Sequence, residues 1–507
     1  MNTFKITNEI NSKASEGSFK PDFEDISAKY THPEWFSQDK LGIFIHWGIY
    51  SVAAFHNEWY PRSIYHVDEN IEANPDLNTC RRHFEKTFGA MSEKGYKDLI
   101  PMFKAENWNP NEWAELFRKS GARYVVPVAE HHDGFPMYEC PFTEWNSAKM
   151  GPKRDIVKEL AEAVRAEGMR LGVSTHRAFN WRFYHFPDGA DNRNPEYSGL
   201  YGKPHPAEQG PDFEFITDWL YRTWDLVDRF QPDILYFDFG WHADEFQGFR
   251  PHIFSYYYNQ AEKWGKDVLV NFKKKCPVEA GIWDLERGQL DGTLDIPWQT
   301  DTSLGLKSWC YTVDDEYRTA DRLIHDLVDI VSKNGNLLIN VGPKADGTIP
   351  EEPRDLLLAM GKWLETNGEA IFGTTYWHSY GEGPNKIKAG HFGERSLKEF
   401  SKEDIRYTIK DNILYAICLG VPANMVSMRV PAESFEKEAI KNISILGGPE
   451  QVKWTYANGA LVIDVPEKLE LEHAVVYKIE MQDEDSLRFD EIKTKPSFTI
   501  DSNGQMS

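Results

Sequence analysis

Short apolar segments alternate with amphipathic helical patterns from Leu41 to Val341, and this alternation limits the fold more than any other feature of the sequence. It indicates a parallel sheet covered by helices, either a closed (β/α) barrel or an open doubly wound sheet. No Gly-rich phosphate-binding motif follows the first strand, so we expect an α/β protein with a (β/α)8-like TIM barrel. The expected strands lie within 41–48, 124–134, 170–174, 234–237, 268–271 and 336–341, and the expected helices at 111–120, 155–167, 213–230, 321–333 and 353–367.

The segment Pro232-Asp-Ile-Leu-Tyr-Phe-Asp-Phe-Gly-Trp241 ends an apolar run in a carboxylate. Residues 234–237 are too continuously apolar for a strand with one face in water, so we expect a strand buried on both faces. Parallel sheets carry their chemistry at the carboxyl ends of the strands, where Asp238 falls. The alternative is an aspartate that caps the next helix or closes a turn. This strand alone leaves both interpretations open.

Beyond residue 375 the pattern changes to short alternating segments with tight turns. Segments 406–409 and 413–419 flank Asp411-Asn412, and segments 452–456 and 461–465 flank Asn458-Gly459, a strong signal for a two-residue hairpin. This pattern predicts a small antiparallel β-sandwich, for which a structural role is favoured over carbohydrate binding. We therefore expect a polar lead-in at 1–30, a barrel domain at 31–375 and a sandwich domain at 376–507.

Composition restricts the class of ligand. The 507 residues suffice for two domains with large cores. A formal net charge of −23, without a cluster of Lys and Arg, argues against a nucleic-acid partner and favours a neutral or small ligand. The chain contains 17 Trp, whose flat faces can cover sugar rings as well as pack a core. The five cysteines are odd in number and unpatterned, so we expect free thiols.

The N-terminus lacks the apolar core of a signal peptide, and no apolar run is long enough to span a bilayer. We therefore expect a soluble protein without a membrane partner, cytoplasmic as the sequence stands, or periplasmic or secreted if a leader precedes it. Whether it forms a homo-oligomer stays open.

Four polar clusters fall at or near expected strand ends: His46-Trp47, Glu58-Trp59-Tyr60, His131-His132-Asp133, and Asp238 with Trp241. Imidazoles and carboxylates can hydrogen-bond sugar hydroxyls, and indoles can cover the apolar face of a ring. Adjacent histidines on an extended chain point to opposite faces and seldom bind one ion, which disfavours a metal. The clusters therefore predict a sugar pocket without a metal or other cofactor.

Several longer motifs occur in a fixed order: Trp35-Phe-x-x-x-Lys-Leu-Gly-Ile-Phe-Ile-His-Trp-Gly-Ile-Tyr-Ser51, Glu58-Trp-Tyr60, His131-His-Asp-Gly-Phe135, Gly151-Pro-Lys-Arg-Asp155, Asn336-Leu-Leu-Ile-Asn-Val-Gly-Pro-x-x-Asp-Gly-Thr-Ile-Pro350 and Asn367-Gly-Glu-Ala-Ile371. Together they resemble glycoside hydrolase family 29, the α-L-fucosidases, over about residues 30–377 and more loosely over the sandwich. The resemblance implies a (β/α)8-like barrel, no metal cofactor, a fucosylated glycan as substrate and a retaining mechanism.

The resemblance also implies roles for individual residues. Asp238 corresponds to the nucleophile, one of the two carboxyl groups that a retaining glycosidase needs. The residues implied to bind the fucose are His46, Glu58, Trp59, His131, His132, Tyr236, Trp241, Lys273 and Trp309.

The general acid/base is less well defined by the resemblance, because the family does not keep this residue at one alignable position. Trp298-Gln-Thr-Asp-Thr302 has Gln299 where some relatives carry Glu, and an amide cannot exchange a proton as a carboxyl does. We predict that Glu286 takes this role from a loop over the pocket, with Asp284, Glu279 and Asp301 as alternatives.

Two departures from the family pattern bear on the substrate. Ser174-Thr-His-Arg-Ala178 replaces a Tyr-containing strand end, and Lys273 stands where relatives have Arg, whose planar fork Lys cannot reproduce. The sequence therefore predicts a retaining exo-glycosidase that removes terminal α-L-fucose. The alternatives are a non-catalytic fucose-binding protein on the same scaffold and a hydrolase of a related 6-deoxy or L-sugar, since one methyl group provides only about 1–3 kcal/mol of discrimination.

Overall fold

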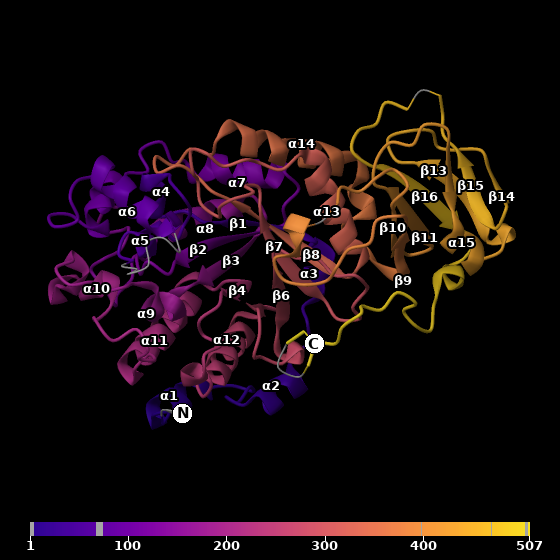
Figure 1. Ribbon diagram of the computed structural model, residues 1–507. Coiled ribbons are helices and arrows are strands. Elements are labelled where there is room, and N and C mark those ends of the chain that lie inside the picture. Colours follow the sequence, from indigo (N-terminus) through magenta and orange to yellow (C-terminus); the bar gives the residue numbers. More distant parts are fainter. Residues whose placement is uncertain (1–4, 67–74, 397, 468, 502–504, 507) are drawn as a thin grey trace.

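The computed structural model describes residues 5–66, 75–396, 398–467, 469–501 and 505–506 (Figure 1). Eight parallel strands close into a barrel in sequence order, which confirms the predicted fold class. The strands are β1 (Leu41–Ile45), β2 (Tyr124–Glu130), β3 (Arg170–Thr175), β4 (Ile234–Phe237), β5 (Leu269–Phe272), β6 (Ile282–Glu286), β7 (Trp298–Ser303) and β8 (Gly335–Val341). The sequence patterns missed β6 and β7, because these strands place polar side chains inside the barrel.

Helices surround the barrel, and local signals fix their ends. The side chain of Asp212 accepts a hydrogen bond from Phe215 N–H and so caps the helix that leads into β4. Asp155 and Asn109 cap their helices in the same way. The helices are α1 (Asn8–Ala14), α2 (Phe23–Lys29), α3 (Glu34–Asp39), α4 (Tyr50–Ala53), α5 (Tyr60–Ser63), α6 (Pro75–Thr87), α7 (Pro110–Lys119), α8 (Ile156–Ala166), α9 (Asn180–Phe183), α10 (Ser198–Tyr201), α11 (Phe213–Phe230), α12 (Arg250–Trp264), α13 (Ala320–Ser332) and α14 (Glu351–Asn367).

Alternation along each strand separates two cores. Along β4, Ile234 and Tyr236 belong to the cluster inside the barrel, whereas Leu235 and Phe237 pack against the surrounding helices. Successive side chains of a strand point to opposite faces, so the next inward position after Tyr236 is residue 238. The same parity applies to the other strands and decides which polar side chains reach the barrel mouth.

The chain beyond residue 375 forms two antiparallel sheets with a shared core, as predicted for the sandwich. One sheet has the order β13-β16-β11-β10-β9 and the other β12-β15-β14. Asn458 and Gly459 both have positive φ, as the predicted hairpin turn requires. The elements are β9 (Thr375–Glu382), β10 (Ile405–Lys410), β11 (Ile413–Cys418), β12 (Met425–Met428), α15 (Arg429–Ser434), β13 (Ile440–Ile445), β14 (Trp454–Ala457), β15 (Ala460–Asp464) and β16 (Val475–Met481).

Both chain ends contact the barrel. Within the expected lead-in, Ile10 of α1 and Ile26 of α2 are buried in the barrel's outer core. At the other end, Ser497 hydrogen-bonds Asp291, and the ring of Phe498 contacts Trp283 of β6. Among the described residues, no helix is both long enough and apolar enough to cross a bilayer.

A buried charge cluster joins the barrel to the sandwich. Asp329 of α13 lies 2.6 Å from Arg406 of β10 and 2.6 Å from Lys333 at the end of its own helix. All three side chains are almost fully buried. Burial alone would raise the pKa of Asp329, but the two cations lower it, so the carboxylate stays ionised between them.

We expect Asp329→Ala to lower the free energy of unfolding by about 3–5 kcal/mol, because the change leaves two buried cations without their counter-ion. Urea unfolding measures the difference. Asp321→Ala is a matched control on the same helix, because Asp321 pairs with His473 at an exposed site, and it should cost less than about 1 kcal/mol. Equal losses in the two variants would show that the cluster does not stabilise the junction.

Candidate active site

The carboxyl ends of the barrel strands enclose a small polar cavity of about 30 Å³. Asp238 follows β4 at an inward position, and Lys273 follows β5 in the same way. Glu286 is the last residue of β6, so the expectation that it lies in a loop was wrong. The cavity is lined by Phe44, His46, Glu58, Trp59, His131, His132, His176, Asp238, Phe239, Lys273, Glu286, Asp301 and Trp309.

Asp238 is surrounded by nitrogen atoms. Its Oδ2 lies 3.2 Å from His132 Nε2 and 3.2 Å from His176 Nδ1, and its Oδ1 lies 3.1 Å from Lys273 Nζ. Burial alone would raise the pKa of Asp238, but Lys273 and the two imidazoles lower it well below its usual range. Asp238 is therefore a carboxylate held ionised in a closed site.

Lys273 holds three carboxyl groups around one ammonium. Its Nζ lies 2.5 Å from Glu286 Oε2, 3.1 Å from Asp238 Oδ1 and 3.6 Å from Asp301 Oδ2. Burial alone would lower the pKa of Lys273, but the neighbouring carboxylates raise it well above its usual value. A permanent positive charge therefore lies between Asp238 and Glu286.

Glu286 differs from Asp238 in its ionisation. Burial raises the pKa of Glu286, and the negative charges of Asp301 and Asp238 act in the same direction. Lys273 opposes them, and the net result is a pKa of about 7. Its side chain lines both the closed cavity and the wider opening above it. The surroundings thus separate the pKa values of the two carboxyl groups, and Glu286 faces the entrance of the cavity. This arrangement is expected of an acid and a nucleophile.

The other carboxyl groups considered for this role are placed differently. Tyr236 O–H lies 2.9 Å from both Asp284 Oδ2 and Asp301 Oδ2, at the base of the cavity, which Asp301 itself lines. Asp284 is fully buried, and burial together with Asp301 raises its pKa well above the usual value. Glu279 is exposed in the short helix Val278–Ala280 and lines neither cavity.

Gln299 lies in the layer beneath the pocket. Its amide donates a hydrogen bond to Asp284 at 2.9 Å and accepts one from Tyr124 O–H at 3.0 Å. This amide is fully buried, so it supports the barrel interior and does not replace a carboxyl at the cavity.

Histidines form one wall of the cavity. His46 Nδ1 lies 2.7 Å from Asn340 Oδ1, and His176 Nε2 lies 2.7 Å from Ser174 Oγ. Burial lowers the pKa of His46, His131 and His176, so these rings are neutral near pH 7 and can both donate and accept hydrogen bonds. Neutral donors and acceptors of this kind suit hydroxyl groups.

Two overlapping sets of these side chains have the spacing of metal ligands: His46, His131 and His176, and His132, His176 and Asp238. In the second set, the ammonium of Lys273 lies 3.1 Å from the carboxylate and opposes a further cation. The first set consists of three neutral imidazoles, which are good zinc ligands in general. In this cavity the same imidazoles also form a polar wall, in which His176 lies 3.2 Å from Asp238.

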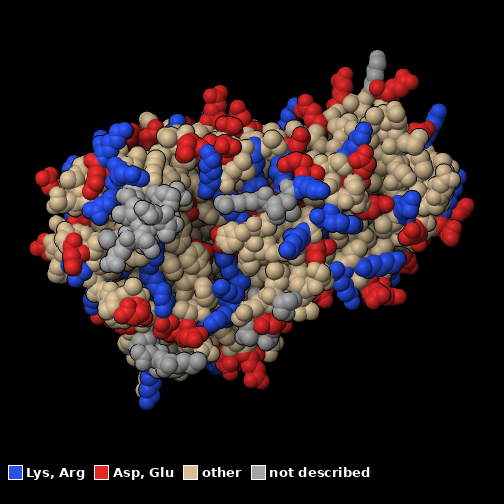
Figure 2. Space-filling view, viewed as in Figure 1, with Lys and Arg blue, Asp and Glu red and all other residues tan. Residues whose placement is uncertain are grey.

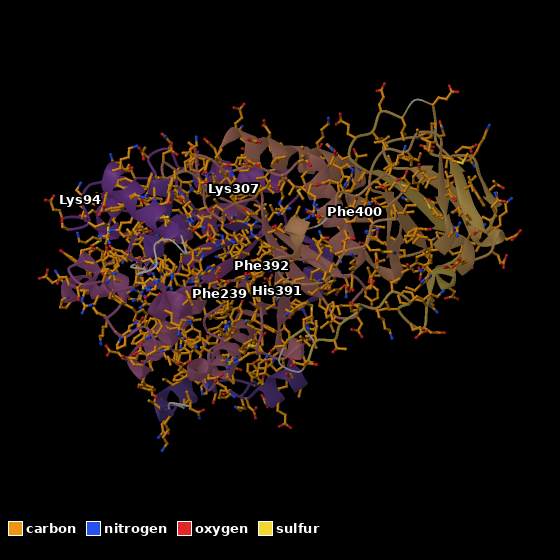
Figure 3. All side chains as sticks on the ribbon, in the orientation of Figure 1. Lys94, Phe239, Lys307, His391, Phe392 and Phe400 are labelled. Atoms are coloured by element: carbon orange, nitrogen blue, oxygen red, sulfur yellow. The ribbon has the colours of Figure 1, made fainter. Side chains whose placement is uncertain are left out.

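The small cavity opens into an outer cavity of about 610 Å³. Glu58, Trp59, Phe239, Lys273, Glu286 and Trp309 line both. Glu58 is fixed there by hydrogen bonds from Ser308 Oγ and Trp309 N–H, at 3.1 and 3.0 Å. Phe239, His391 and Phe392 lie close together on one side of the opening, and Lys307 lies on the other (Figure 3).

One wall of this outer cavity comes from the connection between β9 and β10, within the sandwich. Glu286 N–H donates to His391 Nδ1, and Phe392 N–H donates to the carbonyl oxygen of Glu286. Glu394 forms ion pairs with Arg287 and Arg318, at 3.0 and 2.7 Å. Residues 390–394, which we name the bracing segment, therefore hold the backbone on both sides of Glu286.

Two residues predicted to bind the ligand lie outside the cavity. Tyr236 is fully buried below it and meets the carboxyl groups of Asp284 and Asp301. Trp241 is 1% exposed and stacks on Phe237, on the outward side of β4. Its position three residues after Asp238 suggested the pocket, but the turn at Gly240 returns the chain to the outer core. Trp241 is a packing residue.

The other predicted residues meet in the cavity: His46, Glu58, Trp59, His131, His132, Asp238, Lys273, Glu286 and Trp309. Sequence reasoning did not assign Phe44 or Phe239 to the cavity wall, and it named Asp301 only as an alternative acid/base. It named His176 within a departure from the family pattern, as one of the residues that the pocket could use differently. Strand parity could have identified Asp301, two positions after the inward Gln299.

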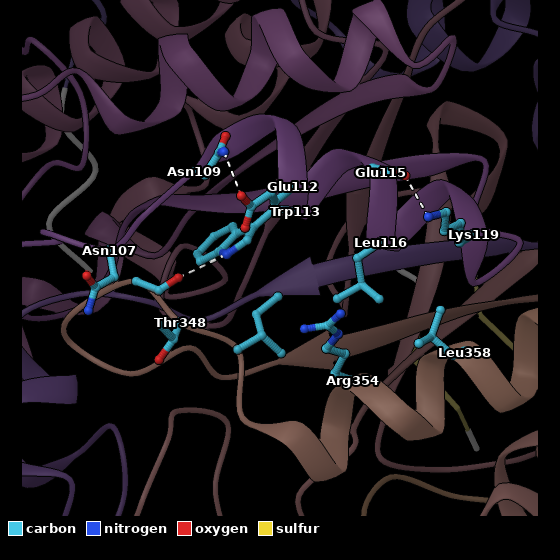
Figure 4. Close-up of a pocket in the computed structure, with 12 residues that line it drawn as sticks. Asn107, Asn109, Glu112, Trp113, Glu115, Leu116, Lys119, Thr348, Arg354 and Leu358 are labelled. Carbon is cyan, nitrogen blue, oxygen red and sulfur yellow. Dashed lines mark hydrogen bonds and ion pairs between the residues drawn. The ribbon is translucent and has the colours of Figure 1, made fainter.

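A separate cavity of about 290 Å³ lies between α7 and α14, away from the barrel mouth (Figure 4). Its polar side chains largely pair with one another. Asn109 donates to Glu112, and Lys119 pairs with Glu115. Trp113 N–H donates to the carbonyl oxygen of Gly347. The barrel mouth, with its opposed carboxyl groups, is therefore the better candidate for a functional site.

Comparison with known proteins agrees with this geometry. The sequence model of the α-L-fucosidase family matches residues 6–369, and that of the α-L-fucosidase C-terminal domain matches residues 398–480. The chain belongs to the α-L-fucosidase family.

Two relatives show over how much of the chain this similarity extends. Tissue α-L-fucosidase of Rattus norvegicus is 31% identical over 446 residues, which are 86% of each protein. The crystal structure of Thermotoga maritima α-fucosidase superimposes with a TM-score of 0.72 and 31% identity, and covers 91% of this chain and 100% of its own. Relatives at this level therefore share both the barrel and the sandwich.

In this member of the α-L-fucosidase family, we expect the two tryptophans near the site to differ in their effect on stability. Trp241→Ala should lower the free energy of unfolding by about 3–5 kcal/mol, because it empties a large site in the core. Trp309→Ala should cost less than about 2 kcal/mol, because part of that ring already faces the cavity. Denaturant unfolding compares them, and an equal or larger loss for Trp309 would contradict these placements.

Proposed function

We propose that this protein is a retaining exo-glycosidase that hydrolyses terminal α-L-fucose from oligosaccharides or glycoconjugates by double displacement. The observation that carries the proposal is the pair of carboxyl groups on either side of Lys273, of which Asp238 is held ionised and Glu286 has its pKa raised to about 7. A retaining glycosidase needs one ionised and one protonated carboxyl at a substrate bond.

The separation of the two groups supports retention. Asp238 Oδ1 and Glu286 Oε2 lie 3.1 and 2.5 Å from the same nitrogen, so they cannot be farther apart than about 5.6 Å, the sum of these distances. Retaining glycosidases place the two groups about 5–5.5 Å apart, whereas inverting enzymes need about 6.5–9.5 Å to admit a water molecule. The shared ammonium therefore favours direct attack by Asp238.

In the first step, the carboxylate of Asp238 attacks the anomeric carbon while Glu286 gives its proton to the departing glycosidic oxygen. This forms a fucosyl ester on Asp238 and releases the leaving group as an alcohol. In the second step, Glu286, now a carboxylate, removes a proton from water, and the resulting oxygen nucleophile displaces Asp238. Both carboxyl groups return to their starting states.

The cavity explains why a terminal sugar is the substrate. Its closed end offers neutral imidazoles for hydroxyl groups, and Phe44, Trp59 and Trp309 provide apolar surface for a ring face and a methyl group. The open side begins at Glu286, where the leaving group would depart. The structure of Thermotoga maritima α-fucosidase in complex with fucose, at 30% identity and a TM-score of 0.71, supports fucose as the bound sugar.

A non-catalytic fucose-binding protein and a hydrolase of a related sugar, the two alternatives, would behave differently from a fucosidase. A fucose-binding protein without catalysis has no need for a carboxyl group whose pKa lies near 7 at the cavity opening. A hydrolase of another 6-deoxy or L-sugar would use the same two carboxyl groups, and the choice of sugar would rest on the hydroxyl partners of the histidines. A screen of aryl glycosides separates all three, and hydrolysis of the α-L-fucoside above the others is the expected result.

We expect Asp238→Ala to reduce the hydrolysis of an aryl α-L-fucoside by at least about 1,000-fold while the protein remains folded, because the attacking group is lost. Azide should restore part of the activity by entering the vacated space and give a fucosyl azide of inverted configuration. NMR of that product provides the measurement. A retained configuration, or near-normal activity in the folded variant, would remove Asp238 from the nucleophile's role.

We expect kcat/KM to fall as pH rises through about 7, because a general acid is active only in its protonated form and the pKa of Glu286 is raised to about 7. In Glu286→Gln this fall should disappear, since an amide does not titrate there. The variant should retain the first step with a good aryl leaving group, which needs little protonation, and should lose most activity on a natural disaccharide.

Asp301→Asn is the matched comparison, because Asp301 also contacts Lys273 but lies below the cavity opening. An unchanged alkaline limb in Glu286→Gln, together with its loss in Asp301→Asn, would transfer the acid/base role to Asp301.

A further inference from the structure

The outer cavity has a charge opposite to that of the protein as a whole. The chain carries a formal net charge of −23, yet the acidic side chains lining this cavity, Glu58 and Glu286, both belong to the inner site as well. The cations Lys274 and Lys307 line its open part. In the space-filling view, Lys and Arg side chains lie above and below the hollow in the barrel face (Figure 2).

Of these two cations, Lys274 has the charge that is less balanced by neighbouring carboxylates. It is exposed, and among the described residues it has no carboxylate within ion-pair distance. Lys307 pairs with Glu316 at 3.1 Å, so part of its charge is already balanced. Lys274 follows β5 and Lys307 follows β7, so the two cations approach the cavity from different strands. A ligand between them would meet a positive charge on two sides.

Two neutral histidines, His242 and His391, line the same opening. Burial, followed by the charges of Lys274 and Lys275, lowers the pKa of His242 to about 4. Burial lowers the pKa of His391 to about 4 as well, with Lys273 and Lys274 acting in the same direction. Both rings are therefore neutral near pH 7. His391 Nδ1 accepts a hydrogen bond from Glu286 N–H, which leaves the proton of the ring on Nε2 as a donor.

Aromatic side chains give this cavity the surface that a sugar ring needs. Phe392 in the bracing segment is 59% exposed, although a large apolar side chain is normally covered. Phe239 and Trp309 line the same space from the barrel side. Apolar ring faces together with cations form a surface for a sugar that carries a negative charge.

We propose that the outer cavity is a leaving-group subsite that prefers an anionic sugar, one bearing a carboxylate or a sulfate ester, with Lys274 as the main cation that recognises it. This inference rests on the proposed fucosidase activity, because it concerns the group attached to the fucose. Phe392, presented by the sandwich, forms the apolar side of the subsite. The sandwich thus takes part in substrate selection as well as in stability.

The test compares three fucosides that share one leaving-group disaccharide, in neutral, carboxylated and sulfated forms. At about 0.05 M salt, we expect kcat/KM for either anionic form to exceed that for the neutral form by about two- to fivefold, within the range that partly exposed ion pairs provide. At about 1 M salt the Debye length falls to roughly 3 Å, and the preference should disappear. A preference for only one of the two anions still supports the subsite and shows whether it recognises a carboxylate or a sulfate ester.

Lys274→Gln should bring the ratio of anionic to neutral substrate close to one at low salt. Lys275→Gln is the matched control, because the neighbouring lysine pairs with Asp244 at 3.0 Å and does not line the cavity, so this variant should keep the wild-type ratio. Equal kcat/KM values for all three substrates in the wild type would overturn the subsite. A ratio that is unchanged in Lys274→Gln would overturn the role of Lys274.

These outcomes are distinct from failure of the proposed function. If no fucoside is hydrolysed, including an activated aryl fucoside, the fucosidase proposal itself fails. If the aryl fucoside and all three disaccharide derivatives are hydrolysed without preference for charge, the proposed function stands and only the anionic subsite is lost.

Discussion

The ammonium of Lys273 is the interaction on which the site depends. It lies 3.1 Å from Asp238 and 2.5 Å from Glu286, and so holds two acidic groups close together in a buried space where their mutual repulsion would otherwise be large. The same charge acts unequally on them. Asp238, which also meets two imidazoles, stays ionised, whereas burial and the neighbouring carboxylates keep the pKa of Glu286 near 7. One buried cation thereby holds the two groups close together, and the imidazoles on one side and the carboxylates on the other separate their pKa values.

Much of the fold could be predicted from the sequence, because strands buried on both faces are continuously apolar and the helices carry their own caps. The strand 234–237 and the helix before it are examples. Strands β6 and β7 escaped prediction because Asp284, Glu286, Gln299 and Asp301 occupy inward positions that are normally apolar. Gln299 hydrogen-bonds Asp284, Tyr236 contacts Asp284 and Asp301, and Glu286 pairs with Lys273. Pairing between distant positions has no local signature in the sequence.

Most residues that the family motifs marked as site residues line one cavity, whereas the prediction was wrong where the fold decides the direction of a side chain. Trp241 follows Asp238 closely in sequence, yet it packs outside the barrel against Phe237. The contribution of residues 390–394 could not be predicted at all. These residues come from a connection between two strands of the sandwich, about a hundred positions after Glu286, and only the folded chain brings them to its backbone.

The central claim is that the two carboxyl groups joined by Lys273 hydrolyse a fucoside with retention. Proton NMR during hydrolysis of an aryl α-L-fucoside tests it most directly, because the two anomers of released fucose are resolved before they interconvert. The account predicts that the α anomer appears first and then equilibrates with the β anomer. If the β anomer appears first, water has attacked the substrate directly, and the assignment of Asp238 as a covalent nucleophile is contradicted.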